Sequence, residues 1–327
     1  MVLRYTAALL VSYIVTFAVG KMLIPALRRI KAEQSIRQDG PVWHNAKQGT
    51  PTMGGIMFIA GVALACLIAG FGDIKRFDLT HVYVFLFALA YAAVGFFDDY
   101  TKLKKKQNLG LIAKHKFLLQ LVIAALFILV MRLSGNLTLN LYIPFINIYL
   151  PIPEPIYYIF AAFVVVGTVN AVNITDGVDG LAAGVTVPVA VCFTIVSILW
   201  RLGALGVFAA SLVGGLLAFL YFNLYPAKIF MGDTGAQFLG GAVCAMAFAA
   251  DMPLILLPLG IVYFVETLSD IIQVAYFKLT HGKRVFKMAP LHHHFEMSGW
   301  SERKIFAVFT LVSAVFAVIS YFGVRFR

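Results

Sequence analysis

Ten apolar runs, separated by short polar loops, follow one another along the 327 residues of the chain. They lie near residues 4–27, 52–72, 81–97, 116–134, 156–172, 180–200, 204–222, 235–251, 254–279 and 305–324. A helix needs roughly 20 apolar residues to cross a bilayer. The pattern therefore predicts an all-α, polytopic integral membrane protein with about ten transmembrane helices. The first run lacks a small-residue cleavage site, so we expect a retained helix rather than a signal peptide.

One connection between the runs has a different pattern. From Asn136 to Pro155 the sequence reads "NLTLNLYIPFINIYLPIPEP", in which apolar and polar residues alternate. Alternation with a period of two is typical of a strand. We therefore expect a small periplasmic β-hairpin at the membrane surface. No repeat or low-complexity segment divides the chain, so we expect a single domain over residues 1–327.

Composition narrows the class of protein. Hydrophobic residues make up 61% of the chain and charged residues 13%, which exceeds what a soluble core can hide. The three cysteines, Cys66, Cys192 and Cys244, lie in separate apolar runs, so we expect neither a disulfide nor a thiolate metal site. The sequence contains no Walker A motif, which excludes an ATP-driven pump of the P-loop type.

The basic residues are divided unequally between the two sets of loops. Only seven of the 26 lysines and arginines fall on one side: Arg4, Lys75, Arg76, Arg132, Arg201, Arg325 and Arg327. Because basic residues in short loops stay cytoplasmic, both termini are predicted to lie outside the cytoplasm. This topology signal is a sufficient explanation of the net charge of +11, although a basic face also attracts anionic lipid or a polyphosphate. We expect no nucleic-acid binding.

Carboxylates gather at the predicted cytoplasmic ends of the helices. Nine of the 15 acidic residues lie there: Asp98, Asp99, Asp176, Asp179, Asp233, Glu266, Asp270, Glu296 and Glu302. Ionisable groups at membrane depth are costly unless they are paired, bind metal or face water. The sequence therefore predicts an active site at the cytoplasmic face.

The first two cytoplasmic loops supply candidate ligands. Lys47 and Thr52 are the polar residues of "HNAKQGTPTMGG" that we expect to bind substrate, whereas Gly54 and Gly55 indicate close helix packing. In the second loop, "FFDDY" places Asp98 and Asp99 at the end of the third helix. Neighbours on a helix point about 100° apart, so one carboxylate can bind an ion while the other acts as a base. We expect the lysines at 102 and 104–106 to be exposed to solvent. Any one of them can also contact phosphate.

The third loop, "NAVNITDGVDG", contains two carboxamides and two carboxylates but no basic residue. Asn170, Asn173, Asp176 and Asp179 are three residues apart, so they form one polar stripe if the segment is helical. Gly177 and Gly180 make a break equally compatible with the sequence. The alternation of ligands and the terminal Glu of an EF-hand are missing, which excludes a calcium loop of that type. Helix caps and turns are the structural alternative.

The fourth and fifth loops add a helix start and a histidine cluster. Asp233, in "FMGDTGAQFLGG", is either an N-cap or, with phosphate oxygens, a ligand of Mg²⁺. The three consecutive histidines of "PLHHHFE" do not have the spacing of a zinc helix motif. A contact between these imidazoles and a polyanion is the better explanation of the three histidines.

Carboxylates, lysines and histidines at one membrane surface suit phosphoryl transfer to a lipid acceptor. A water-soluble acceptor would not need ten spans around the site. The ninth run carries Pro253 and Pro258 near its start, so we expect part of it to bend away and leave a lipid-accessible groove.

Four blocks, "FFDDY", "NAVNITDGVDGLAAG", "FMGDTGAQFLGG" and "PLHHHFE", resemble the signatures of the polyprenyl-phosphate N-acetylhexosamine-1-phosphate transferases. The resemblance covers essentially the whole chain, and "HNAKQGTPTMGG" is similar to the muramoyl-pentapeptide branch. It implies transfer of phospho-N-acetylmuramoyl-pentapeptide from its UDP derivative to undecaprenyl phosphate, giving lipid I and UMP, with Mg²⁺. It also implies ten helices, a bacterial inner membrane location and a homodimer. The residues themselves give no argument for the homodimer.

The resemblance also implies roles for individual residues. Asp233 resembles the magnesium ligand, Asp98 and Asp99 the catalytic aspartate pair with Asp98 as base, and His292 a catalytic residue that contacts phosphate. The nucleotide-sugar pocket is matched by Asn173, Asp176, Gly177, Asp179, Phe230, Gln273 and His293, with Phe230 stacked on uracil. Lys47, Lys106 and Lys114 match contacts to diphosphate or lipid phosphate, and Asn170 and Thr52 complete the candidate substrate-binding set.

Two alternatives to this function and two routes for its chemistry stay open at this point. A lipid or secondary transporter also has about ten spans, but it places binding residues near the membrane midplane. A related transferase would use another UDP-N-acetylhexosamine. The lipid phosphate can attack the diphosphate directly, or an aspartyl nucleophile can form a phospho-enzyme first.

Overall fold

The computed structural model describes residues 1–30, 32, 47–105, 107 and 110–326. Its elements are helices α1 (Val2–Arg29), α2 (Gly55–Ala69), α3 (Phe71–Ile74), α4 (Thr80–Lys105), α5 (Ala113–Leu133), α6 (Glu154–Thr175), α7 (Leu181–Leu199), α8 (Gly203–Asn223), α9 (Gly232–Ala249), α10 (Leu256–Leu259), α11 (Ile261–Leu279), α12 (Leu291–Glu296) and α13 (Glu302–Val324), strands β1 (Asn140–Ile143) and β2 (Ile148–Pro151), and the 3-10 turn η2 (Pro253–Ile255). The protein is a mostly helical, polytopic membrane protein, as predicted.

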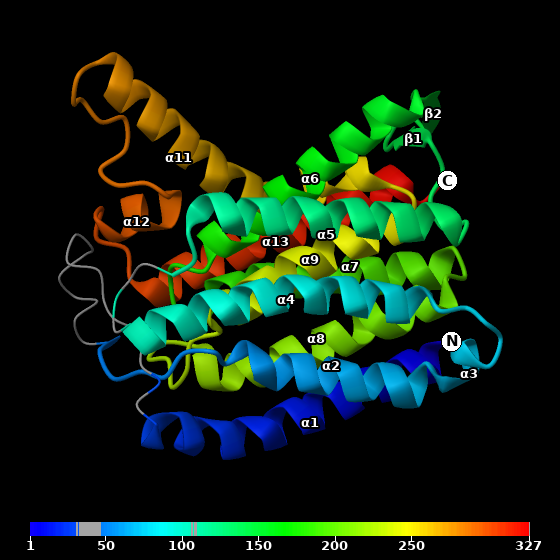
Figure 1. The fold of residues 1–327 in the computed structure, drawn as a ribbon, viewed down its shortest axis with the longest axis horizontal. Helices are drawn as coiled ribbons and strands as arrows, with labels where there is room; N and C mark the ends of the chain where they lie inside the picture. The colour runs from blue at the N-terminus through cyan, green and yellow to red at the C-terminus, as the bar shows by residue number, and fades with distance from the viewer. Residues whose placement is uncertain (31, 33–46, 106, 108–109, 327) are drawn as a thin grey trace.

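Each of the ten apolar runs contains helix. In the described part of the chain, seven helices are long and apolar enough to cross a membrane, and the bent pair Pro253–Leu259 and Ile261–Leu279 is an eighth candidate. The two halves of this pair meet at 79°, which confirms the predicted bend, and α11 leaves the bundle in Figure 1. The helix α2 has only 15 residues, and α9 has a polar first half. The count of ten spans therefore stays a prediction.

Helix α9 lies at the centre of the bundle. Every residue of it from Thr234 to Phe248 is buried, and its main neighbours are α4 and α6. Protein rather than lipid surrounds α9, so its side chains do not have to be strongly apolar. This position brings the polar first turn of α9 into contact with the helices on both sides.

Glycines allow the close contacts of α9. A Cβ added at Gly55 would lie 2.3 Å from the Cα of Gly235, and one added at Gly95 would lie 2.1 Å from the carbonyl oxygen of Asp233. The expected packing role of Gly55 is confirmed. Small residues at such contacts let helix backbones approach and increase van der Waals packing in membrane proteins.

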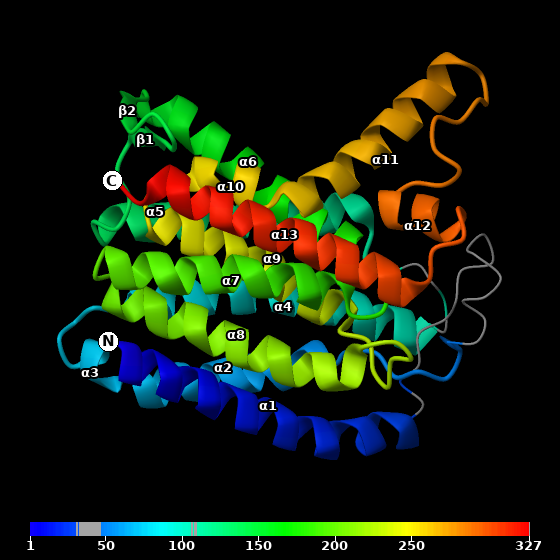
Figure 2. The same cartoon turned by 180° about the vertical axis from the view of Figure 1, so that it is seen from behind.

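The two ends of the bundle differ. The strands β1 and β2 form the predicted antiparallel hairpin, pairing Asn140 with Pro151. The hairpin, α3 and both chain termini lie at one end, and α12 lies at the other (Figures 1 and 2). The three cysteines are free and buried. The placement of both termini outside the cytoplasm stays a prediction.

Replacing Gly55 by Ala should destabilise the fold, because the new methyl group meets the backbone of α9. Overpacking of this kind costs about 1–3 kcal/mol, so the midpoint of thermal unfolding in detergent should fall by several degrees. Gly72→Ala is the matched control, since a Cβ at Gly72 meets nothing within 4 Å. Equal midpoints for the two variants would contradict the packing role.

Candidate active site

The site begins at the first turn of α9, where Asp99 of α4 caps the helix. One carboxylate oxygen of Asp99 accepts a hydrogen bond from the backbone N–H of Asp233 (3.0 Å). The other oxygen accepts bonds from the N–H (2.9 Å) and hydroxyl (2.7 Å) of Thr234. A carboxylate here satisfies N–H groups that have no partner within the helix and interacts favourably with the helix dipole. Gly232 has a φ of +69°, and a Cβ there would lie 2.6 Å from Asp99 Oδ2.

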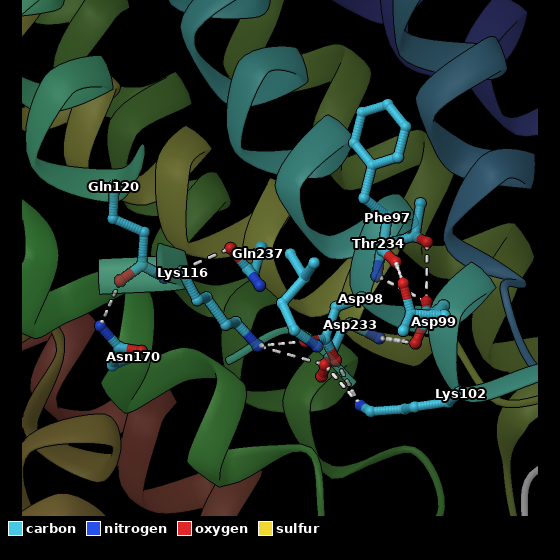
Figure 3. Close-up of polar contacts among 12 residues, drawn as sticks. Phe97, Asp98, Asp99, Lys102, Lys116, Gln120, Asn170, Asp233, Thr234 and Gln237 are labelled. Atoms are coloured by element: carbon cyan, nitrogen blue, oxygen red, sulfur yellow. Dashed lines mark hydrogen bonds and ion pairs between the residues drawn. The ribbon is translucent and has the colours of Figure 1, made fainter. Parts of the chain in front are cut away.

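Asp98 points in another direction and meets two lysines. Its Oδ2 lies 2.6 Å from Nζ of Lys102, and its Oδ1 lies 3.8 Å from Nζ of Lys116 and accepts the N–H of Leu111 (2.9 Å). The same two lysines contact Oδ2 of Asp233, at 2.7 Å for Lys102 and 3.2 Å for Lys116. Figure 3 shows the lysines reaching the carboxylates from opposite sides. The expected difference in partners between Asp98 and Asp99 is confirmed.

The three carboxylates form a group that can hold a metal ion. One ligand oxygen each from Asp98, Asp99 and Asp233 lies within 4.8 Å of the others. Asp98 and Asp99 are 3% and 4% exposed. Clustered carboxylate oxygens are the donors that hard divalent cations prefer, and the lysines supply positive charge at the same oxygens. The donor set therefore fits a divalent cation or the phosphate complex of one.

The segment "NAVNITDGVDG" is helical only in its first half. Asn170 and Asn173 belong to α6, which ends at Thr175, and Asp176 is the C-cap residue. Asp179 follows a turn and precedes α7. The polar residues therefore do not form one helical stripe, and the break that the glycines allowed is present.

Asn170 belongs to a buried chain of amides. It donates through Nδ2 to Oε1 of Gln120 (2.9 Å), and Gln120 donates to Oε1 of Gln237 (3.3 Å). Gln120 is one turn after Lys116 on α5, and Gln237 is one turn after Asp233 on α9. The amide chain thus ties α5, α6 and α9 together to one side of the acidic cluster (Figure 3). The structure places Asn170 in a helix contact, and its role toward substrate stays a prediction.

Asp179 has a basic partner from a distant loop. Lys47 places its Nζ 2.7 Å from Asp179 Oδ1 and 2.7 Å from Glu302 Oε2. Asp179 also accepts the backbone N–H of Ala227 (2.9 Å). Burial alone would lower the pKa of Lys47, but the negative charges of Asp179 and Glu302 outweigh it and raise the pKa. Lys47 therefore compensates the negative charge of this loop, although it lies far from the loop in the sequence.

Asp176 lies in a more negative environment. Burial, and then the charges of Asp233 and Asp99, raise the pKa of the Asp176 carboxyl well above its ordinary value. The positive charge of Lys47 opposes this shift but does not cancel it. The negative charges of the acidic cluster therefore disfavour the ionised form of Asp176.

The histidine cluster forms α12 and sends its rings to different partners. His292, only 1% exposed, contacts Oε2 of Glu266 through Nδ1 (2.9 Å). His293 contacts Glu296 through Nδ1 (2.6 Å). A Cβ added at Gly177 would lie 2.1 Å from Nε2 of His292. His292 therefore lies against the loop that follows α6, which explains the glycine at position 177.

The other predicted site residues are spread around this centre. Phe230 presents its ring 6.0 Å from Nζ of Lys47, and the buried Thr52 lies beside Gly232. Gln273 holds the segment after α11 by accepting the N–H groups of Val285 and Phe286, both at 3.0 Å.

Lys114 and Lys106 are the remaining predicted lysines. Lys114 is exposed in the first turn of α5. Lys106 lies outside the described residues.

Sequence reasoning missed several residues of the site. The expectation of a solvated run is wrong for Lys102, which binds Asp98 and Asp233. Lys102 lies four residues after Asp98 on the same helix, and this spacing alone could have predicted their contact. Lys116 and Glu302 have no such signal, because their nearest partners, Asp233 and Lys47, lie more than 100 residues away.

A cavity of about 330 Å³ opens beside Asp179. The other residues that line it are Leu224, Tyr225, Arg303 and Phe306. The guanidinium carbon of Arg303 lies 5.8 Å from the ring centre of Tyr225. The cavity therefore combines apolar and aromatic walls with one carboxylate and one guanidinium.

Known proteins are similar to this chain over nearly its whole length. Residues 81–251 match the family described as glycosyl transferase family 4, and residues 47–59 match phospho-N-acetylmuramoyl-pentapeptide-transferase signature 1. The phospho-N-acetylmuramoyl-pentapeptide-transferase of Clostridium acetobutylicum is 44% identical over 96% of this chain and 97% of its own. The chain belongs to the phospho-N-acetylmuramoyl-pentapeptide transferase family.

Further members of this transferase family show similar coverage. The proteins of the same name from Caldanaerobacter subterraneus subsp. tengcongensis and Heliobacterium modesticaldum are 42% and 44% identical to this chain. They cover 99% and 98% of it, and the aligned regions span 99% and 98% of their own lengths. The matched signature contains Lys47 and Thr52, two of the candidate substrate-binding residues.

Replacing Lys47 by Met should destabilise the transferase, because it leaves Asp179 and Glu302 without their shared cation. Breaking a fully buried pair costs about 3–5 kcal/mol, and the partial exposure of Lys47 reduces this to about 2–3 kcal/mol. We expect a lower midpoint of thermal unfolding in detergent. Adding Glu302→Gln should restore part of the loss by removing the repulsion between the carboxylates.

The matched control is Lys104→Met, which removes an equal charge from an exposed position. Its unfolding midpoint should stay that of the unmodified protein. A Lys47→Met variant as stable as this control would mean that Lys47 serves ligands only.

Proposed function

We propose that this chain transfers phospho-N-acetylmuramoyl-pentapeptide from UDP-N-acetylmuramoyl-pentapeptide to undecaprenyl phosphate, giving lipid I and UMP. The observation that carries the proposal is the meeting of three carboxylates with Lys102 and Lys116 at one end of an apolar bundle. Membership of the family supports the donor and the acceptor. We further propose that residues 1–327 form one transferase domain in the bacterial plasma membrane, with this end facing the cytoplasm, and that the chain works as a homodimer.

In the reaction we propose, an oxygen of the lipid phosphate attacks the β-phosphorus of the UDP donor. The bond from that phosphorus to UMP breaks, and UMP leaves with the bond electrons. Asp98 removes a proton from the lipid phosphate or orients it, and Lys102 and Lys116 move from their carboxylates onto phosphate oxygens. Stabilising the charge that develops in this way is the main source of catalysis in phosphoryl transfer.

We propose Mg²⁺ as the cation of the acidic cluster. Mg²⁺ is usually held by one or two carboxylates together with substrate phosphates, and Asp233, with Asp98 and Asp99 nearby, offers that donor set. When bound, the ion would spread the negative charge of the diphosphate.

We favour direct attack over a phospho-enzyme. The direct route uses Asp98 only as a base or orienting group, with its Oδ1 held by the N–H of Leu111, and it needs no covalent intermediate. Trapping a covalent phospho-sugar on the enzyme in the absence of lipid would exclude the direct route.

The donor would lie between the acidic cluster and the loop after α6. In this proposal Phe230 stacks on uracil, and the sugar and nucleotide contact Asn173, Asp176, Gly177, Asp179, Gln273 and His293. His292, Thr52, Lys47, Lys106 and Lys114 serve phosphate groups. Because Lys47 already binds Asp179 and Glu302, we propose that it holds the pocket wall and shares its remaining donor with the diphosphate.

Release of UMP tests the function. The purified protein, with undecaprenyl phosphate and Mg²⁺, should release UMP from UDP-N-acetylmuramoyl-pentapeptide at least about tenfold faster than from UDP-N-acetylglucosamine, since a site that binds the larger donor uses those contacts in the transition state. Preference for the smaller donor would identify a related transferase instead. No UMP from either donor would refute the enzyme and leave transport as the alternative.

Asp233→Asn should reduce the turnover number for UMP release by at least about 100-fold, because it removes a charged ligand at the centre of the cluster. Donor binding, measured by titration without lipid and without Mg²⁺, should change little. Asp176→Asn is the contrasting variant: its KM for the donor should rise about tenfold, with turnover within about threefold of the unmodified enzyme. Near-normal turnover of Asp233→Asn at low Mg²⁺ would show that the metal is held elsewhere.

A further inference from the structure

Glu266 is buried where the bent helix α11 meets α12. It is 0% exposed and lies in the second turn of α11, after the 79° bend. Its carboxylate accepts the backbone N–H of His292 (3.2 and 3.4 Å to the two oxygens) and contacts Nδ1 of the same residue (2.9 Å). We propose that Glu266 is a positioning residue that orients His292 for the transfer reaction. This inference rests on the proposed function.

The contact sets the position of the imidazole ring and also its protonation. An ionised carboxylate only accepts hydrogen bonds, so the Nδ1 atom beside Glu266 must carry a proton. The backbone bond fixes the start of α12 at the same time. Nε2 is then the nitrogen left for another partner, and its direction is set by a residue on a different helix.

Nε2 of His292 is buried and has no hydrogen-bond partner in the described part of the chain. It faces the backbone at Gly177, between Asp176 and Asp179. A buried polar atom without a partner costs about 1–3 kcal/mol, and we infer that a group of the bound donor becomes the partner of Nε2. The group that suits Nε2 is a hydroxyl of the nucleotide-sugar donor when the ring is neutral and Nε2 accepts, or a phosphate oxygen when the ring is an imidazolium and Nε2 donates.

The second histidine is not held in the same way. His293 pairs with Glu296, three residues along the same short helix, and its side chain is 16% exposed. That contact is local and does not connect two elements. Glu266 and His292 are 26 residues apart and both 1% exposed in their side chains. The bend of α11 is therefore linked to the ring that faces the donor loop.

The experiment compares UMP release by Glu266→Gln, Glu266→Asp, His292→Gln and the double variant Glu266→Gln/His292→Gln. Gln keeps the size of Glu266 but has one acceptor oxygen for two donors, and its amide can donate to Nδ1. We expect turnover of Glu266→Gln to fall about 10- to 100-fold, with KM for the donor changed less than about threefold. Glu266→Asp, which keeps the carboxylate, should retain more turnover than Glu266→Gln.

Since Glu266 acts through His292, the double variant should be no slower than His292→Gln alone. Asp270→Asn is the control. Asp270 lies one turn further along α11 and, within the described residues, makes no hydrogen bond to His292, so its turnover should stay within about threefold of the unmodified enzyme. This control separates loss of the contact from loss of a nearby negative charge.

Nitrogen NMR of protein labelled at histidine gives a readout that does not need activity. The ring signals of His292, assigned by their loss in His292→Gln, should report a protonated Nδ1 that changes in Glu266→Gln. The inference fails if Glu266→Gln keeps turnover within twofold, if its signals are unchanged, if Glu266→Asp is no better than Glu266→Gln, or if the losses multiply in the double variant. Lack of UMP release by the unmodified protein would refute the proposed function, and the NMR signals would still test the pairing.

Discussion

The carboxylate of Asp99 accepts the first backbone N–H groups of α9, and the rest of the site depends on this contact. It fixes the start of the central helix against α4, in a place where water cannot satisfy those donors. Asp233 is thereby held beside Asp98, and both acids need positive charge because they are removed from solvent. Lys102 and Lys116 supply it.

The same requirement explains how distant loops are joined at this end of the bundle. Lys47 connects the first loop to Asp179 and Glu302, and Glu266 connects α11 to α12. Each link compensates a buried charge with a group from another element. The charges that stabilise the folded site are also the charges that a diphosphate and a divalent cation would engage, so the function we propose exchanges one set of ionic partners for another.

Much of the fold could be predicted from local patterns. The apolar runs located the helices, the alternation after Asn136 located the hairpin, and two prolines indicated the bend before α11. The gathering of acids toward one end was visible in the sequence, and the structure brings Asp98, Asp99 and Asp233 together. The lysine partners were missed, because a basic run beside a membrane segment is also a topology signal and its composition alone cannot separate the two uses.

The sequence by itself determined where the chain is apolar enough for membrane, where it turns and which chemical groups lie at each end, because these properties depend on neighbouring residues and on the length of a run. Only the tertiary structure decided that Asp99 caps α9, that Lys47 compensates Asp179 and that Glu266 holds His292. The first two contacts join residues more than 100 positions apart, and the third crosses from a bent helix to the short helix that follows it. Pairing at such distances depends on which helices pack together. The spacing of residues within one segment cannot predict it.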